Sequence, residues 1–282
     1  MITPYFGEFL IIPMPLELSL ERCSNSCAYC FSNLNGYKMK RSIQSILNHL
    51  QGFGTRKDQA SLLLREKRPI CFSNRSDPFA ASNYKNAIAI CELCEALDID
   101  IAFQTKGGKG IDDVLSFVKP SIWYITISQD DDGLRKRLEP GTIAINARLK
   151  LIEKLVAKGH MVNVGVNPFV PEWIKDCRQL VRNIKKAGCY GITVEGLHFS
   201  NEQVKRLEPD AIDYEIVQRS LKKKVTEWEL NEYKKICDII LDEGLELWSF
   251  WNRHVSNFWQ PYYDRYRCFP ILTNFTNYVF CF

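Results

Sequence analysis

The sequence predicts an α/β fold, a partial (β/α)6 TIM-like barrel with a C-terminal helical and aromatic extension. Short apolar runs rich in branched and aromatic residues alternate with amphipathic stretches, which is the pattern of βαβ units around a parallel sheet. Polar residues gather directly after the apolar runs, where the loops of such a barrel bind ligands. The sequence holds six strand–helix repeats, which fit a partial barrel better than a complete one of eight.

The predicted strands are short and carry the branched and aromatic side chains that pack well on a pleated sheet. They span residues 17–20, 69–73, 99–105, 122–128, 161–167 and 191–197. The predicted helices fall between them, at residues 43–51, 82–97, 111–117, 142–158 and 174–187. The helix from Thr142 has the clearest limits, because Pro140 and Gly141 precede its apolar periodicity and Gly159 ends it.

The regular alternation ends after Leu197. Residues 200–207 and 226–243 have helical patterns, and residues 245–250 fit one more strand. The segment 251–282 is aromatic and irregular, and we expect it to close the barrel mouth. We therefore predict a barrel over residues 1–200 and an extension over residues 201–282 that packs on it without forming an independent domain.

Polar clusters follow the predicted strands directly, at the edge of the barrel where ligands bind. The first cluster is the loop after residues 17–20. The others occupy residues 73–78, 104–108, 128–130, 167–168 and 191–196. A random globular chain need not align its polar residues in this way, so the pattern predicts one binding face.

Three cysteines in that first loop, Cys23, Cys27 and Cys30, are the most informative residues of the chain. Thiolates at this spacing can bind three corners of a four-iron four-sulfur (4Fe-4S) cluster, a group that usually takes four cysteines. The next cysteine along the chain is Cys71. A cluster held by three thiolates leaves one iron open to a substrate or cofactor, so the trio predicts a catalytic cluster.

Other interpretations of the trio stay open at this point. Structural zinc usually takes four ligands, and none of the four histidines lies within a few residues of the loop. A redox pair of Cys27 and Cys30 would leave Cys23 unexplained. Chance clustering is a further alternative in a chain with 11 cysteines.

Size and composition exclude several broad classes. At 282 residues, 46% of them hydrophobic, the chain can bury a substantial core. No apolar run reaches the roughly 18 residues that span a bilayer, and the N-terminus lacks the pattern of a secretory signal. An odd number of cysteines without such a signal indicates a reducing compartment. We therefore expect a cytoplasmic protein that does not enter a membrane.

The net charge of +4, from 37 basic and 33 acidic residues, is mild for a nucleic-acid binder. A run of three lysines at residues 222–224 is more often a solvated helix face than a binding site. Arginines and aromatic residues mix over residues 251–267. That mixture fits stacking on bases and equally fits a C-terminal packing layer.

The C-x3-C-x2-C spacing, with the aromatic Tyr29 before the last cysteine, resembles the signature of the radical S-adenosylmethionine (SAM) enzymes. More specifically, the chain resembles the spore photoproduct lyase-like branch of that superfamily, whose members are often labelled DNA-repair photolyases. Besides the cysteine loop, the matching segments are residues 73–79, 104–107, 127–129, 138–141, 146–149 and 166–171. The resemblance covers roughly residues 16 to 200, in matching order and spacing.

The resemblance implies a barrel of the radical SAM type with a 4Fe-4S cluster on the cysteine trio and S-adenosyl-L-methionine (SAM) as second cofactor. One electron, from a donor such as flavodoxin or ferredoxin, then cleaves SAM to a 5′-deoxyadenosyl radical. Ser76 and Lys106 map onto SAM-contacting positions. Glu139 and Arg148 map onto a paired motif beside the cofactor.

The chemistry of SAM assigns further candidate contacts. Its carboxylate needs a cation, for which Lys106 and Arg148 are the candidates. Ser76, Asp77 and Ser128 suit its amino and ribose groups; residues 191–197 offer a backbone edge and Tyr29 an aromatic wall to the adenine.

Each candidate contact also has a purely structural interpretation. Lys106 fits a turn before two glycines, and Asp77 before proline fits a turn start. Ser76 and Ser128 fit loop caps. Arg148 fits a solvated helix face paired with Glu139.

The substrate does not follow from the resemblance. Asn74 stands where the lyase carries the cysteine that donates hydrogen to its substrate radical. Cys71 is expected to be buried; Cys268 and Cys281 are weaker candidates for a donor or a second cluster. We expect core packing from Cys91, Cys94, Cys177, Cys189 and Cys237.

The sequence thus predicts a radical SAM enzyme, lyase- or oxidoreductase-like, that abstracts hydrogen from an unidentified substrate. Analogy favours a nucleic acid or nucleotide as that substrate. One alternative is a peptide- or protein-modifying maturase. Another is a non-catalytic metal-containing protein that binds nucleic acid, and metal analysis separates it from an enzyme: about four irons per chain favour the enzyme, and one zinc favours the scaffold.

Overall fold

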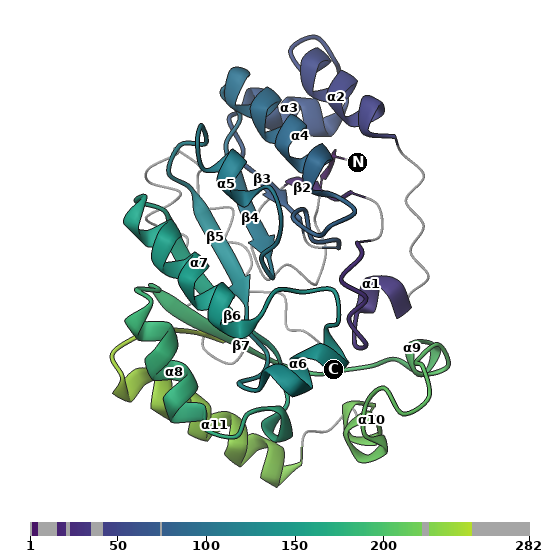
Figure 1. Cartoon of the computed structure of the whole chain (residues 1–282). Helices are drawn as coiled ribbons and strands as arrows, with labels where there is room; N and C mark the ends of the chain where they lie inside the picture. Colours follow the sequence, from purple (N-terminus) through teal and green to yellow (C-terminus); the bar gives the residue numbers. More distant parts are fainter. Residues whose placement is uncertain are drawn as a thin grey trace. The chain divides into compact units, whose positions relative to one another are not determined.

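The structure is a computed structural model that describes residues 2–4, 16–20, 23–34, 42–73, 75–221 and 226–249 (Figure 1). Its described residues divide into two compact units. The first holds those up to Ser24 and from Ser42 to Trp123. The second holds Asn25 to Leu34 and those from Tyr124 onward.

The first unit contains the strands β1 (Ile2–Pro4), β2 (Leu16–Leu18), β3 (Ile70–Phe72) and β4 (Ile101–Thr105). β1 pairs antiparallel with β2, and β2, β3 and β4 pair in parallel and in chain order. Both faces of β3 are buried, as in parallel sheets covered by helices. This burial explains why the strand consists of an uninterrupted apolar run.

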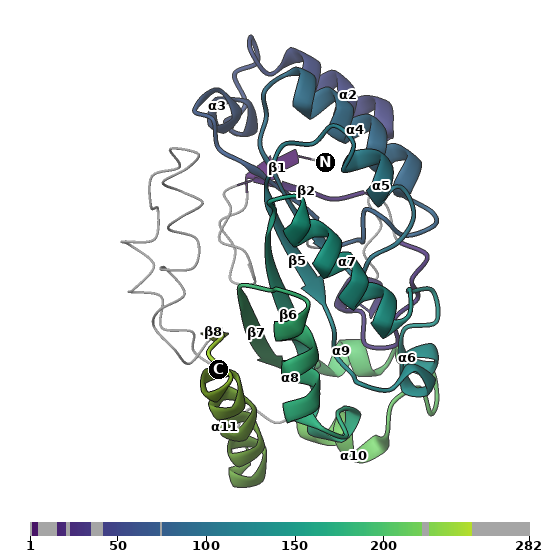
Figure 2. The same cartoon turned by 60° about the vertical axis from the view of Figure 1, so that its left-hand side comes forward.

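The helices of the first unit are α2 (Ile43–Gly52), α3 (Gln59–Arg65), α4 (Tyr84–Ala96) and α5 (Ile111–Val114). Ser42 and Asp58 cap α2 and α3 by accepting hydrogen bonds from backbone N–H groups of the first turns. α2 and α4 run side by side (Figure 2). Within the same unit, Phe103 stacks on Trp123 with 4.1 Å between ring centroids, which builds an aromatic core.

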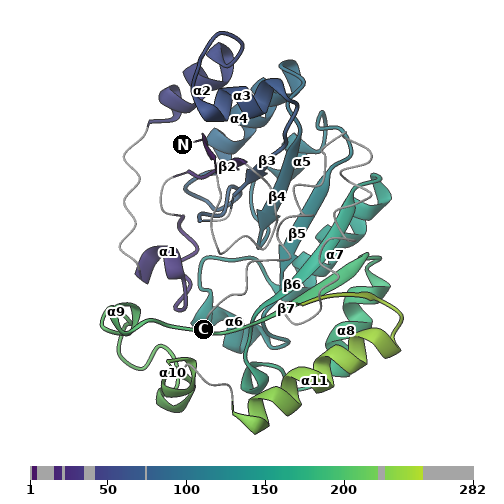
Figure 3. The ribbon, with the colours of Figure 1, turned by 180° about the vertical axis from the view of Figure 1, so that it is seen from behind.

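β5 (Ile122–Thr126) crosses the boundary, so its last residues belong to the second unit. There β6 (Met161–Phe169), β7 (Gly191–Gly196) and β8 (Glu246–Ser249) pair in parallel. The longer helices are α7 (Ile145–Ala157), α8 (Cys177–Lys186) and α11 (Glu227–Asp242). α8 and α11 lie side by side (Figure 3).

Short helical elements complete the second unit. They are α1 (Phe31–Leu34), α6 (Asp132–Leu138), the 3-10 turn η1 (Pro171–Trp173), α9 (Asn201–Val204) and α10 (Tyr214–Ser220). None of the described helices has the length and hydropathy required to cross a membrane.

All six predicted strands are confirmed, as is the extra strand expected near residues 245–250. Two helix starts lie three residues after the expected ones. α7 begins at Ile145 rather than at Thr142, because the Thr142 hydroxyl bonds to the Glu139 carbonyl instead of capping a helix. α8 begins at Cys177 rather than at Ile174, since Asp176 caps it and η1 occupies the preceding turn.

Several sequence predictions lie outside the described residues. These are the aromatic tail from Trp251, the lysine run at residues 222–224, Asn74, Cys268 and Cys281. Of the cysteines expected in the core, Cys91, Cys94, Cys189 and Cys237 are buried, as is Cys71. The prediction for Cys177 is wrong: it is only partly buried, because it opens α8 and lines a groove between α8 and α11.

Candidate active site

The cysteine loop begins in the first unit, where hydrogen bonds fix the residue after Cys23. The backbone N–H of Ser24 donates to Ser82 Oγ at 3.0 Å, and the N–H of Ser82 donates to Ser24 Oγ at 3.1 Å. This reciprocal pair fastens the start of the loop to the turn that precedes α4.

The rest of the loop belongs to the second unit and is held by backbone hydrogen bonds. The Cys30 N–H donates to the Cys27 carbonyl at 3.1 Å, which closes a turn between the two thiols. The Ala28 N–H donates to the Leu138 carbonyl at 2.8 Å, and the Gly141 N–H donates to the Asn25 carbonyl at 3.0 Å. The loop is therefore fastened on both sides of Glu139.

The donor set of the loop fits an iron–sulfur cluster. Cys23, Cys27 and Cys30 carry thiols rather than disulfides, and each is partly exposed. Within the described ranges, no three His, Cys, Asp or Glu side chains are arranged to hold a single metal ion. The thiols of a cluster bind different irons and stand farther apart than ligands around one ion. The cluster assignment thus rests on three available thiols at C-x3-C-x2-C spacing.

Glu139 and Arg148 form a fully buried ion pair in the second unit. Arg148 Nη2 donates to Glu139 Oε2 at 2.5 Å and to Thr142 Oγ1 at 2.6 Å. Arg148 Nη1 donates to the Thr126 carbonyl at 2.9 Å. The expected pairing of Glu139 with Arg148 is confirmed. The interpretation that Arg148 lies on a solvated helix face is wrong, because the side chains of both residues are 0% exposed.

Tyr29 connects the cysteine loop to that pair. Its hydroxyl donates to Glu139 Oε1, and its ring lies 5.5 Å from that of Trp173. Burial raises the pKa of the Tyr29 hydroxyl well above its ordinary value, and the nearby Glu139 and Cys27 raise it further. Tyr29 therefore stays protonated and remains a hydrogen-bond donor.

In the first unit, Asp77 organises the loops after β3 and β4. Its carboxylate accepts hydrogen bonds from Thr105 Oγ1 at 2.7 Å, the Lys106 N–H at 2.8 Å and the Phe79 N–H at 3.0 Å. Burial raises the pKa of Asp77, although these donors and the Lys106 charge act in the opposite direction. The carboxylate thus serves the predicted turn and holds the backbone of Lys106.

The two predicted serine contacts donate to backbone carbonyls. Ser76 Oγ donates to the Leu20 carbonyl at 3.1 Å in the first unit. Ser128 Oγ donates to the Asn167 carbonyl at 2.8 Å in the second. A hydroxyl that donates its proton in this way still offers lone pairs to an ammonium or a ribose hydroxyl.

The predicted site residues therefore fall into two sets, one in each unit. The first unit holds Cys23, Ser76, Asp77 and Lys106. The second unit holds Cys27, Tyr29, Cys30, Ser128, Glu139 and Arg148. Sequence reasoning missed Ser82, Thr105 and Thr142, which hold these residues in place. Each had a sequence signal of another kind, because Ser82 and Thr142 begin predicted helices and Thr105 lies in the polar cluster of residues 104–108.

Glu195, at the end of β7, is a further titratable group beyond the predicted set. Burial raises its pKa from the ordinary 4.5 to about 8. The folded chain then keeps a proton that the unfolded chain releases above pH 4.5. We expect the free energy of unfolding to fall as the pH rises through this window, by at most about 1.4 kcal/mol per pH unit.

Glu195→Gln tests this dependence, because glutamine cannot ionise. Urea unfolding at about pH 5.5 and about pH 7.5 should show a smaller loss of stability in the variant than in the parent protein. Equal losses in both proteins would assign the pH dependence to other groups.

No protein-family model matches the chain. It is 27% identical over 199 residues to the uncharacterized proteins Rv2578c of Mycobacterium tuberculosis (strain ATCC 25618 / H37Rv) and Mb2609c of Mycobacterium bovis (strain ATCC BAA-935 / AF2122/97). The aligned region covers 62% of this chain and 56% of each relative. The chain thus spans about half the length of the curated relatives it matches.

Solved structures show the same fold. Spore photoproduct lyase complexed with dinucleoside spore photoproduct superposes with a TM-score of 0.60 at 16% identity, covering 88% of this chain and 80% of the lyase. Streptococcus suis SuiB bound to S-adenosylmethionine gives a TM-score of 0.51 at 13% identity, covering 83% of this chain and 47% of SuiB. The predicted α/β fold, like that of the lyase and of SuiB, is confirmed.

Proposed function

We propose that this chain is a radical SAM enzyme that binds a 4Fe-4S cluster through Cys23, Cys27 and Cys30. The observation that carries the proposal is a loop with three partly exposed cysteine thiols after β2, in a fold shared with spore photoproduct lyase and SuiB. When bound, the cluster and SAM supply one-electron cleavage of SAM to a 5′-deoxyadenosyl radical, which abstracts hydrogen from the substrate.

The protein's own residues bind and orient the cofactor. Lys106 supplies the cation for the carboxylate of SAM, since charge-assisted hydrogen bonds are strong. Ser76 and Ser128 accept hydrogen bonds from its amino and ribose groups, because their own protons are donated to backbone carbonyls. Asp77 acts on Lys106 by holding its backbone N–H.

A nucleic acid or nucleotide is the proposed substrate class. The support is the lyase, whose solved complex contains a dinucleoside spore photoproduct and which has the higher TM-score of the two structures. A peptide is the second candidate, because SuiB has been solved with its precursor peptide SuiA. One fold can serve unrelated substrates, so both classes enter the test.

Anaerobic reconstitution with iron and sulfide, followed by SAM and dithionite, tests the proposed reaction. We expect about four irons per chain and production of 5′-deoxyadenosine. Flavodoxin or ferredoxin should replace dithionite as electron donor. The assay is then repeated with oligonucleotides, nucleotides and peptides, and the true substrate class should accelerate nucleoside formation. Reconstituted protein that never forms 5′-deoxyadenosine would contradict the proposal.

Lys106→Ala should weaken SAM binding by about tenfold or more, the effect of losing a charged hydrogen bond. Iron content should remain unchanged, because the lysine is not a cluster ligand. Calorimetric titration of SAM into the reconstituted variant measures the affinity, and iron analysis provides the control. Loss of iron to the same extent would show that Lys106 is structural.

A further inference from the structure

We propose that Tyr29, Glu139 and Arg148 are positioning residues that seat the cysteine loop. In this assignment, Glu139 and Arg148 do not touch SAM. The consequence for catalysis rests on the proposed function, whereas the seating itself is a property of the protein without cofactors.

Both carboxylate oxygens of Glu139 already accept hydrogen bonds from protein groups. Oε1 accepts from the Tyr29 hydroxyl. Oε2 accepts from Arg148 Nη2 at 2.5 Å and from Thr142 Oγ1 at 3.3 Å. The side chain is 0% exposed. A ligand would have to displace one of these donors to reach the carboxylate.

The guanidinium of Arg148 is also directed at the protein. It donates to Glu139, to Thr142 Oγ1, to the Thr126 carbonyl and, through Nε at 3.3 Å, to the Ile143 carbonyl. A guanidinium has five N–H donors in a fixed planar arrangement. Four contacts in one plane and complete burial keep the group in a single orientation. Arg148 thus supports Glu139 and is poorly placed to receive a carboxylate from solvent.

Tyr29 links Glu139 to the segment that carries Cys27 and Cys30. It lies two residues after Cys27 and directly before Cys30. Its bond to Glu139 lies between the two backbone bonds that join Asn25 and Ala28 to the Leu138–Gly141 turn. The side-chain and backbone bonds therefore converge on one short turn, so the conformation of the Cys27–Cys30 segment depends on Glu139.

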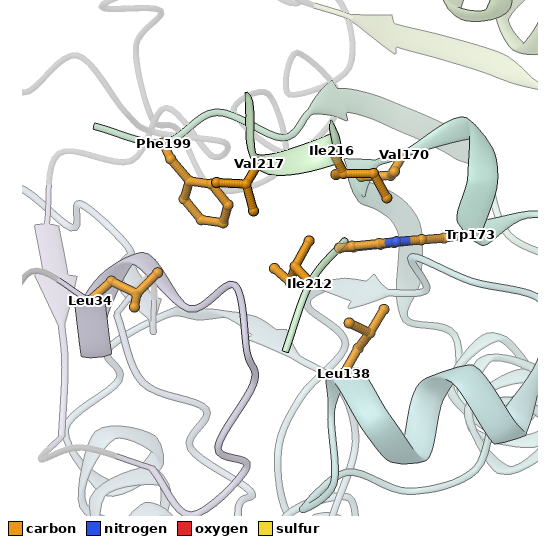
Figure 4. Packing of buried hydrophobic residues seen from close by; sticks show 8 residues of the cluster. All are labelled: Leu34, Leu138, Val170, Trp173, Phe199, Ile212, Ile216 and Val217. Carbon is orange, nitrogen blue, oxygen red and sulfur yellow. The ribbon is translucent and has the colours of Figure 1, made fainter. Parts of the chain in front are cut away.

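The exit of the loop is held by apolar packing. Leu34, the last residue of α1, belongs to a buried cluster within the second unit (Figure 4). The cluster consists of Leu34, Leu138, Val170, Trp173, Phe199, Ile212, Ile216 and Val217. Arg206 Nη1 also donates to the Leu34 carbonyl at 2.9 Å. Trp173, another member of the cluster, also packs against the Tyr29 ring. The cluster therefore contacts the loop segment at both Tyr29 and Leu34.

Thiol alkylation of the cofactor-free protein tests the seating directly. The rates at which iodoacetamide modifies Cys27 and Cys30 are measured by peptide mass spectrometry in the full chain. Tyr29→Phe removes the hydroxyl that donates to Glu139, and Glu139→Gln removes the negative charge of the accepting group. We expect both variants to raise these two rates about fivefold to tenfold, because Tyr29→Phe removes the hydrogen bond to Glu139 and Glu139→Gln leaves it with an uncharged, weaker acceptor.

Controls separate local loosening from unfolding. Tyr214→Phe makes the same change at a side chain that is 73% exposed and should leave the rates unchanged. Cys91 and Cys94, which are fully buried in the first unit, report unfolding. If Glu139→Gln exposes these two as well, Tyr29→Phe decides the question, since it preserves the ring packing on Trp173.

Unchanged alkylation of Cys27 and Cys30 in Tyr29→Phe would overturn the proposal. Titration with SAM after reconstitution supplies the second readout. If the substituted residue contacted SAM instead of seating the loop, its variant would bind SAM more weakly while Cys27 and Cys30 were alkylated at the rates of the parent protein. A protein that forms no 5′-deoxyadenosine but shows the expected alkylation would refute the proposed function and leave the seating intact.

Discussion

Replacing Cys27 with alanine is expected to abolish iron binding and 5′-deoxyadenosine formation together. Two thiolates would remain for a cluster that needs three, so the cluster would not be retained. The protein should stay folded, because Cys27 is partly exposed and contributes little to the core. Iron and sulfide analysis, the visible absorption of the reconstituted protein and chromatographic detection of the nucleoside measure the result.

Cys177→Ala is the matched control. Cys177 is also a partly exposed free thiol, but it opens α8 and lies far from the loop in the sequence. This variant should retain iron and nucleoside production. Parental nucleoside production in Cys27→Ala would remove the basis for a cluster on this loop.

The strands could be predicted from the sequence because parallel strands buried on both faces require apolar runs with few interruptions. The short helices α6 and α10 could not be predicted in this way. α6 and α10 span seven residues each, too few for a 3.6-residue apolar period to stand out. α6 is nevertheless important to the site, because Leu138 at its end accepts the hydrogen bond from Ala28.

The cysteine trio was the part of the site most easily predicted from the sequence, since the prediction needs only the identity and spacing of three residues in one loop. Asp77 was harder to interpret: its position before Pro78 indicates a turn, and its position at a strand end indicates a ligand contact. The structure shows that its carboxylate holds the turn and the Lys106 backbone. Sequence alone gave no means of counting the donors around it.

The burial of Arg148 was beyond sequence reasoning. An arginine at this point of α7 has the polarity of a solvated residue, and its neighbours Leu151 and Ile152 complete an apolar face without it. Its buried position depends on hydrogen bonds to Glu139, nine residues earlier, and to Thr142 on the turn between them. Tyr29 lies 110 residues before Glu139, so no local pattern connects the two.

Arg148→Met is expected to destabilise the fold by about 3–5 kcal/mol, because it leaves the Glu139 carboxylate buried without its cation. Methionine preserves most of the side-chain volume, so the loss would come from the charge and the hydrogen bonds rather than from a cavity. Urea unfolding of the cofactor-free variant, followed by circular dichroism, measures the change.

The double variant Glu139→Leu with Arg148→Met shows whether the loss reflects an unpaired charge. Replacing both partners of a buried pair by apolar residues is often close to neutral, whereas removing one partner is costly. We expect the double variant to be more stable than Arg148→Met alone, although the Tyr29 hydroxyl loses its acceptor. Additive losses from the two substitutions would instead mean that each residue stabilises the turn separately. In that case the cysteine loop would depend on the Leu138–Gly141 backbone rather than on the ion pair beneath it.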